Sequence, residues 1–327
     1  AIAGGGIWAI LAMPITSAAV GSFGALARCG WRPKTLFRFG AVRPFIRMSL
    51  NLLGFNVINY WSRTIDNLLV GKRLGEAQLG YYSRAYTLML LPLSQVTGVI
   101  SSGALPAMAR AADDKPRVLR GYLDAMRMIA FVTFPMMTGL TLVADPFVRV
   151  VYGEKWAPMI PILQILSMVG VLQSLTNPMG WIFVSQGRTD RLARWGLGAC
   201  SAIIAALAFG AWIGSTVAIA VAYLVVNAIL VPIVVSYAGG LIGLNFRMLL
   251  GAVAPSGLAT IVMAALVAAV RAVPPLRLHA DVSLAACVAT GIVGYLLPTH
   301  VMRNPAYLEA RLFIKNRLSP PKGGAVG

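Results

Sequence analysis

The polar residues best suited to bind a ligand lie in the segment NYWSRTIDNLLVGKRLG, residues 59–75. Three of them, together with Asn56 just before the segment, follow i, i+3, i+7, i+10 spacing and therefore share one helix face: Asn56, Asn59, Arg63 and Asp66. Asn67 lies at the edge of that face. A charged side chain inside a bilayer costs about 2.5–3.5 kcal/mol on insertion scales, so it normally faces a partner or a water-filled cavity.

The following segment, YYSRAYTLMLLPLSQ, places Arg84 and Gln95 near one face of a second helix. Arginine presents a planar fork of donors that suits phosphate and carboxylate oxygens. Arg63 and Arg84 could therefore bind an anionic head group. The alternative is structural: Arg63 pairs with Asp66 along one helix, and Arg84 extends to the lipid head groups.

The elements that position these residues are membrane helices. The 327 residues are 58% hydrophobic and only 12% charged, and the mean hydropathy is +0.77, whereas soluble domains carry roughly a quarter charged residues. Apolar runs of this length cross a bilayer only as helices, because a helix satisfies its own backbone. The sequence therefore predicts an all-α integral membrane protein.

Nine spans are predicted, at about 3–25, 46–69, 80–108, 121–151, 158–185, 192–211, 214–238, 249–271 and 280–302. Their connections are too short for a separate soluble domain. Most Lys and Arg residues fall in alternate connections and in the tail, and the positive-inside rule assigns that side to the cytoplasm. The formal charge of +18 is explained by this topology, so nucleic acid is not an expected partner.

The sequence lacks the residues of an enzyme site. His279 and His300 have no spaced ligand partner, and Asp113 and Asp114 fit a helix start, with Asp114 as the cap ahead of Pro116. Three scattered cysteines fit neither disulfides nor a metal site: Cys29, Cys200 and Cys287. No enzyme activity, metal or cofactor is expected.

Three other features of the sequence are weaker indicators of a functional site. One polar set in the fifth span is typical of hydrogen bonding between helices: Gln164, Ser167, Gln173, Ser174 and Asn177. Trp156 before Pro158 is typical of an interfacial anchor. Proline and glycine inside the spans, including Pro178, can mark bending points of a transporter, although membrane helices often contain them.

Three quoted segments carry a resemblance to a known family: NYWSRTIDNLLVGKRLGEAQLGYYSRAYTLMLLPLSQVTGVISSGALPAMAR, GEKWAPMIPILQIL and SQGRTDRLARWG. They resemble the polysaccharide-export branch of the multidrug/oligosaccharidyl-lipid/polysaccharide exporter superfamily, the Wzx-type flippases. The strong part covers about residues 40–200, and the hydropathy pattern extends it along the chain.

The resemblance implies two pseudo-symmetric six-helix lobes around a cavity, often followed by two further helices. Residues 1–45 would be the last helix of the first lobe and a basic cytoplasmic linker, residues 46–238 the second lobe, and residues 239–327 two additional helices and a tail. About five helices of the first lobe are absent from this sequence. Since it begins without Met, we expect a fragment.

The function implied by the resemblance is flipping of an undecaprenyl-diphosphate-linked oligosaccharide across the bacterial inner membrane, with a cytoplasmic C-terminus. In that interpretation Arg63 and Arg84 hold the diphosphate, and Asp66 orients Arg63 or takes part in ion coupling. Weaker sugar contacts would come from Asn59, Asn67 and Gln95. The implied partners are the lipid-linked oligosaccharide, membrane lipids, and a polysaccharide polymerase with its chain-length machinery.

Three alternatives remain open at this point. An ion-coupled drug antiporter of the same superfamily would favour cavity carboxylates, and Asp66 is the acid deep enough to serve. A membrane glycan polymerase or glycosyltransferase would be expected to carry acidic motifs in a large external loop. For a scaffold that transports nothing, neutralising either arginine would alter stability alone.

Overall fold

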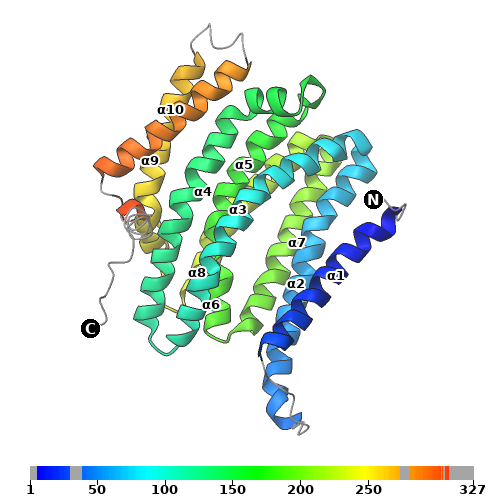
Figure 1. The fold of residues 1–327 in the computed structure, drawn as a ribbon, viewed down its shortest axis with the longest axis vertical. Coiled ribbons are helices and arrows are strands. Elements are labelled where there is room, and N and C mark those ends of the chain that lie inside the picture. The colour runs from blue at the N-terminus through cyan, green and yellow to red at the C-terminus, as the bar shows by residue number, and fades with distance from the viewer. Residues whose placement is uncertain (1–5, 30–38, 273–279, 303, 305, 309–327) are drawn as a thin grey trace, which may run out of the picture. The chain divides into compact units, whose positions relative to one another are not determined.

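The computed structural model of the chain describes residues 6–29, 39–272, 280–302, 304 and 306–308. Within them the backbone is helical and contains no strand (Figure 1). The helices are α1 (Gly6–Cys29), α2 (Phe39–Leu74), α3 (Glu76–Arg110), α4 (Lys115–Val151), the 3₁₀ turn η1 (Glu154–Trp156), α5 (Met159–Thr176), α6 (Met179–Ser185), α7 (Thr189–Ile213), α8 (Thr216–Gly239), α9 (Phe246–Ala272) and α10 (Ala280–Val301). The predicted all-α fold is confirmed.

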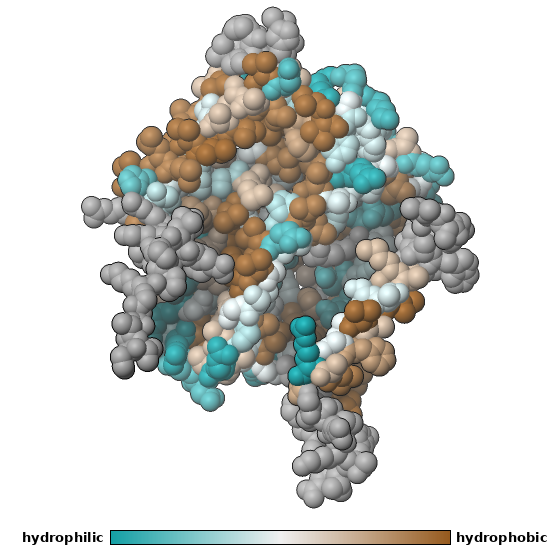
Figure 2. All heavy atoms as spheres, viewed as in Figure 1, coloured by the Kyte–Doolittle hydropathy of each residue, from teal (hydrophilic) through white to brown (hydrophobic). Residues whose placement is uncertain are grey.

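Seven described segments are long and apolar enough to cross a membrane, judged by length and composition: α3, α4, α5 with α6, α7, α8, α9 and α10. Where the structure describes them, the nine predicted spans fall mainly on helical backbone, with α5 and α6 sharing one span, and residues 3–5 of the first predicted span lie outside the described residues. On the face drawn in Figure 2, hydrophobic residues cover much of α9 and α10, and hydrophilic residues gather toward helix ends. The chain is therefore a multi-pass membrane protein.

The chain divides into two compact units, residues 1–46 and residues 47–327. The first unit contains α1 and the first turns of α2, and the second contains the remaining helices. The assignment of these parts to a linker, a second lobe and two additional helices stays a prediction.

Helix α4 is the centre of the packing in the second unit, where it contacts α3, α5, α9 and α10 (Figure 1). Helix α5 also packs against α8, which in turn packs against α7. Gly170 permits the approach of α5 to its neighbours, because a Cβ there would lie 2.7 Å from the Met137 sulfur and 3.1 Å from Met89 Cγ. A larger residue at 170 would separate these helices.

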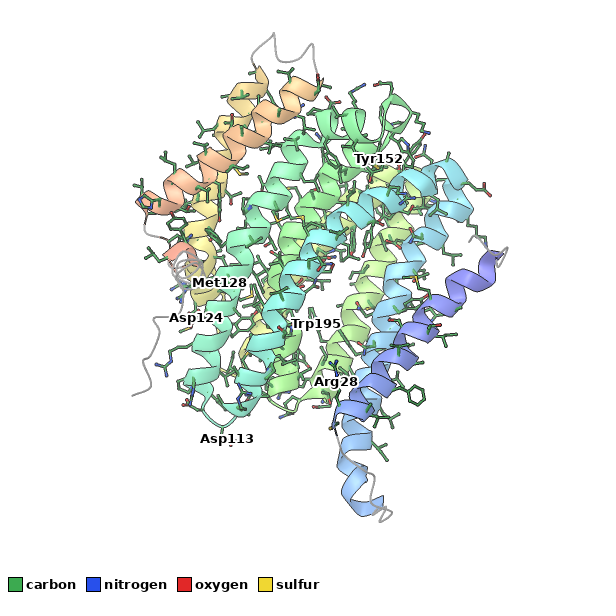
Figure 3. All side chains as sticks on the ribbon, in the orientation of Figure 1. Arg28, Asp113, Asp124, Met128, Tyr152 and Trp195 are labelled. Atoms are coloured by element: carbon green, nitrogen blue, oxygen red, sulfur yellow. The ribbon has the colours of Figure 1, made fainter. Side chains whose placement is uncertain are left out.

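The start of α4 confirms the predicted cap. The Asp114 carboxylate accepts a hydrogen bond from the backbone N–H of Arg117 at 3.1 Å, and proline occupies the first turn. This cap satisfies one of the donors that a helix start leaves without a partner. The neighbouring Asp113 lies at the exposed turn between α3 and α4 (Figure 3).

Asp114→Ala is expected to lower the free energy of unfolding by about 1 kcal/mol, because the Arg117 N–H loses its partner. Equilibrium unfolding in mixed micelles measures the difference. Asp113→Ala is the matched control and should leave stability unchanged, since Asp113 makes no capping bond. Equal losses in both variants would contradict the assignment of the cap.

The opposite end of α4, where Figure 3 labels Tyr152, carries an aromatic cluster made of Tyr81, Tyr152 and Trp156. Both tyrosine rings lie 5.6 Å from the Trp156 ring between centroids, and the Tyr81 hydroxyl donates to the Lys155 carbonyl at 3.2 Å. Aromatic residues with a polar tip concentrate at membrane interfaces. The cluster supports the interfacial role predicted for Trp156, and it joins the start of α3 to the end of α4.

Charged residues attach α9 to the same end of α4. Arg271 donates to the Leu142 carbonyl and lies 3.9 Å from the Asp145 carboxylate. Asp145 also accepts from Arg149 at 2.8 Å, and Arg149 in turn bonds Glu154. This network fixes the end of the α9–α10 pair against α4.

Candidate functional site

A cavity of about 440 Å³ lies within the second unit, between α2, α3, α5, α6, α7 and α8. Four amide side chains line it: Asn59, Gln173, Asn177 and Asn227. Hydroxyls are contributed by Ser94, Thr97, Ser101 and Thr176, and aromatic rings by Phe55, Trp181, Phe183, Trp195 and Tyr223. Its size and its mixture of aromatic surface with a few polar groups are typical of a small-molecule site.

A helix break places two of these amides at the cavity. Asn177 and Pro178 separate α5 from α6 within one apolar segment. Pro178 has no N–H, so the carbonyl four residues earlier loses its helical partner. The Trp181 N–H bonds the Pro178 carbonyl at 3.0 Å, three residues back, which tightens the first turn of α6. Broken helices at membrane depth occur where protein or a water-filled cavity receives the freed groups.

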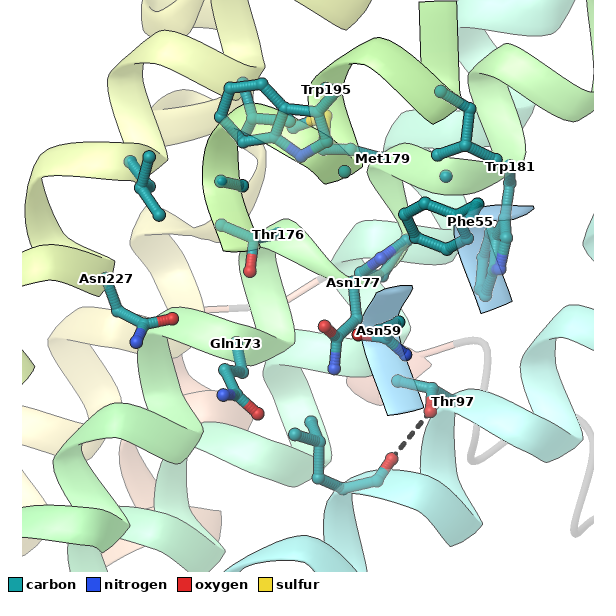
Figure 4. A pocket seen from close by; sticks show the side chains of 18 of the residues that line it. Phe55, Asn59, Thr97, Gln173, Thr176, Asn177, Met179, Trp181, Trp195 and Asn227 are labelled. Carbon is teal, nitrogen blue, oxygen red and sulfur yellow. Dashed lines mark hydrogen bonds between the residues drawn. The ribbon is translucent and has the colours of Figure 1, made fainter. Parts of the chain in front are cut away.

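Gln173 is held by a hydrogen bond between helices. Its Nε2 donates to the Tyr223 hydroxyl on α8 at 2.7 Å, and Asn227, one turn further along α8, donates to the Tyr223 carbonyl at 2.8 Å. The Gln173 side chain is buried, and its Oε1 has no hydrogen-bond partner among the described residues. Figure 4 shows both amides beside Thr176 and Asn177 around the same space.

The aromatic side chains are fixed by packing. Trp195 stacks on Tyr237, with ring centroids 6.2 Å apart. Phe55 occupies the space beside Gly196, where a Cβ would lie 2.6 Å from the phenyl ring. The glycine therefore lets the Phe55 ring from α2 lie against α7 at the cavity wall (Figure 4).

Of the predicted site residues whose side chains the structure describes, one lines the cavity and the others lie outside its lining. Asn59 lines the cavity. Arg84 and Gln95 are exposed on α3 and lie outside the lining residues, with Arg84 six positions before the first lining residue of that helix, Leu90. Six residues of helix correspond to about 9 Å. Arg63 lies in α2, and its side chain is outside the described residues.

Asp66 and Asn67 lie about two turns along α2 from Asn59. Asp66 is 2% exposed, and its carboxylate accepts from the Asn67 N–H at 2.7 Å. Tyr82 interacts electrostatically with Asp66. Ring centroids are 6.4 Å apart both between Tyr82 and Tyr86 and between Tyr86 and Tyr223. A row of tyrosines therefore connects the surroundings of Asp66 with the cavity.

Several cavity residues were not predicted as site residues. Gln173 and Asn177 belonged to a set interpreted as contacts between helices, whereas the tryptophans at 181 and 195 were not singled out. Within that set, Ser167 and Ser174 bond carbonyls of their own helix. The available signal was the Asn177–Pro178 pair, a helix breaker with an amide in an apolar span.

Comparison with known proteins identifies a group of bacterial membrane proteins. The family model described as "Polysaccharide biosynthesis protein" matches residues 1–161. The chain is 27% identical to teichuronic acid biosynthesis protein TuaB of Bacillus subtilis, over 90% of this chain and 61% of that protein. It is 28% identical to lipopolysaccharide biosynthesis protein WzxC of Escherichia coli, over 63% of this chain and 42% of that protein.

Another relative is the succinoglycan biosynthesis transport protein ExoT of Rhizobium meliloti, 27% identical over 70% of this chain and 46% of that protein. The chain thus spans only part of the length of these relatives. Among solved structures, the lipid II flippase MurJ in an inward closed conformation matches with a TM-score of 0.63 and 15% identity, over 82% of this chain and 56% of that one. The chain therefore shares the fold of that solved structure, and the predicted resemblance to polysaccharide biosynthesis and transport proteins is confirmed.

Proposed function

We propose that this chain, which is similar to membrane proteins of polysaccharide biosynthesis, takes part in flipping a lipid-linked oligosaccharide across the bacterial inner membrane. The carrier would be undecaprenyl diphosphate. The observation that carries the proposal is a cavity of amides, hydroxyls and aromatic rings inside a bundle with the fold of a lipid II flippase. The chain acts as a transporter and not as an enzyme.

The cavity chemistry suits a glycan. Amide groups both donate and accept hydrogen bonds, so Asn59, Asn177 and Asn227 can bind sugar hydroxyls that act as donors or as acceptors. Aromatic rings offer apolar surface of defined shape beside those polar groups. A glycan that leaves the cytoplasm loses hydrogen bonds to water, and leaving its hydroxyls without partners in an apolar environment costs free energy. The polar groups of the cavity can replace those lost hydrogen bonds.

The mechanism would be alternating access, in which two lobes rock around a site near the bilayer midplane. In this scheme residues 46–238 form the second lobe, and the helix break at Asn177–Pro178 is one point where the bundle adjusts. The C-terminal tail is cytoplasmic, as the distribution of Lys and Arg suggests. A polysaccharide polymerase and its chain-length machinery would act on the delivered product.

Arg63 and Arg84 are proposed to hold the diphosphate, and Asp66 to orient Arg63 or to take part in ion coupling. We expect Arg63→Gln and Arg84→Gln each to lower polysaccharide export about tenfold or more, because removing a charged hydrogen-bond partner of a phosphate is costly. Export is measured in cells that lack their own flippase, at matched membrane levels. The unaltered protein should restore export.

Two results would contradict this scheme. Failure of the unaltered protein to restore export would count against the flippase function. Full export by both variants would leave the arginines as interface residues, with Asn59, Asn67 and Gln95 as the remaining predicted contacts.

One observation favours a second function. Asp66 is a buried carboxylate connected by tyrosines to the cavity, and an ion-coupled drug antiporter would use such a group. Drug resistance of the same cells separates the two functions. A flippase leaves the minimum inhibitory concentrations of organic cations unchanged, whereas an antiporter raises them.

A further inference from the structure

We infer that Gln173 selects the sugar in this cavity, by accepting a hydrogen bond from a hydroxyl of a neutral sugar ring. The inference rests on the proposed function and adds to it the class of ligand group and the residue that recognises it. Three observations carry it: the hydrogen bonding of Gln173, its burial and the chemistry of its neighbours.

The first observation concerns the two ends of the amide. Nε2 donates to the Tyr223 hydroxyl at 2.7 Å, which fixes the orientation of the side chain. Oε1 has no hydrogen-bond partner among the described residues. A buried acceptor without a donor is uncommon in proteins and unfavourable, so it calls for an explanation.

The second observation is the position of this acceptor. Gln173 is 5% exposed and lines the cavity about one turn before the helix break at Asn177–Pro178. The terminal torsion of a glutamine is soft, so a small rotation presents Oε1 to a ligand. A ligand that donates a hydrogen bond there satisfies an acceptor that has no partner among the described residues.

The third observation is the neighbourhood, which identifies the ligand as a sugar. Thr176, Asn177 and Asn227 surround the same space (Figure 4) and supply neutral donors and acceptors. Trp181 adds apolar ring surface to the cavity wall. A sugar ring carries several hydroxyl donors on an apolar carbon frame and therefore matches both parts of this lining.

Tyr223 is then a positioning residue. Its hydroxyl holds Nε2, and its ring lies beside Tyr86, with centroids 6.4 Å apart. Without the Tyr223 hydroxyl, Gln173 is free to turn its NH₂ group toward the ligand. A site built to hydrogen-bond a ligand hydroxyl rejects analogues that lack this hydroxyl, so the discrimination depends on an amide whose acceptor faces the ligand.

The test measures the affinity of the purified chain in lipid nanodiscs for two neutral probes, cellotetraose and chitotetraose. Tryptophan fluorescence and calorimetry monitor the binding. We expect at least one probe to bind. Gln173→Leu should weaken that binding about tenfold, because Oε1 is the acceptor. Tyr223→Phe should weaken it about threefold, and the double variant should bind like Gln173→Leu alone, because the tyrosine acts through the glutamine.

The matched control is Gln164→Leu, another glutamine of α5 that lies outside the cavity lining, and it should bind as the unaltered protein does. Size-exclusion profiles show whether each variant is folded. The inference is overturned if neither probe binds, or if folded Gln173→Leu and Tyr223→Phe both keep full affinity. Export by the unaltered protein in cells tests the flippase function separately, so the two failures are distinguishable.

Discussion

Gly98→Phe is expected to abolish polysaccharide export while the protein still folds and reaches the membrane. Gly98 lies on the cavity face of α3, and a Cβ at this position would have no neighbour within 4 Å. A phenyl ring can therefore enter the cavity without disturbing the packing. The ring removes the space that the glycan needs, so export should fall by about a hundredfold, as expected when a ligand cannot enter its site. Export at matched membrane levels measures the effect.

Gly103→Phe is the control for this substitution. Gly103 belongs to the same helix, also has no neighbour within 4 Å of a Cβ, and lies outside the cavity lining. Both variants change helix propensity by a similar amount. Export retained by the Gly103 variant and lost by the Gly98 variant would place transport at the cavity. Equal export by both would contradict this.

Gly210→Val is expected to prevent the second unit from folding. A Cβ at Gly210 would lie 2.6 Å from the Ile219 Cα and 3.0 Å from the Ala218 carbonyl oxygen. These atoms are backbone of α8, so no side chain can move away to make space. Helices that approach this closely use small residues at the contact. The variant should lose about 3 kcal/mol or more of stability, at the upper end of overpacking effects.

The measurement is the fraction of monodisperse protein after extraction in mild detergent, followed by thermal unfolding. Gly198→Val is the control on the same helix, because a Cβ there meets nothing within 4 Å. It should yield folded protein in normal amounts. A folded Gly210 variant with an unchanged unfolding temperature would show that α7 and α8 do not pack as described.

The helices were predictable from the sequence because their signal is local. Each span is an apolar run bounded by turn residues, and a run of about 20 apolar residues matches the length of a helix that crosses the bilayer and satisfies its own backbone. The Asp114 cap was predictable for the same reason, since the capping bond joins residues three apart. The all-α membrane fold class could therefore be predicted from the sequence, whereas the number of spans could be predicted only approximately: nine were predicted, and seven of the described segments are long and apolar enough to cross a membrane.

The cavity was less predictable because its residues come from six helices. Asn59 could be identified from the polar stripe of α2, whereas the partner of Gln173 is Tyr223, fifty residues away. Periodicity identifies which face of a helix is polar but not which other helix it meets. The role of Gln173 therefore became visible only with the contact to α8.

The most direct test of the central claim is the leaflet in which the lipid-linked oligosaccharide resides. Cells without their own flippase would express the unaltered protein, Gly98→Phe or Gly103→Phe, and a glycosidase added to the periplasmic side would report access to the glycan. We predict cleavage with the unaltered protein and Gly103→Phe, and protection with Gly98→Phe. Protection in all three, or equal cleavage with Gly98→Phe, would contradict flipping through this cavity.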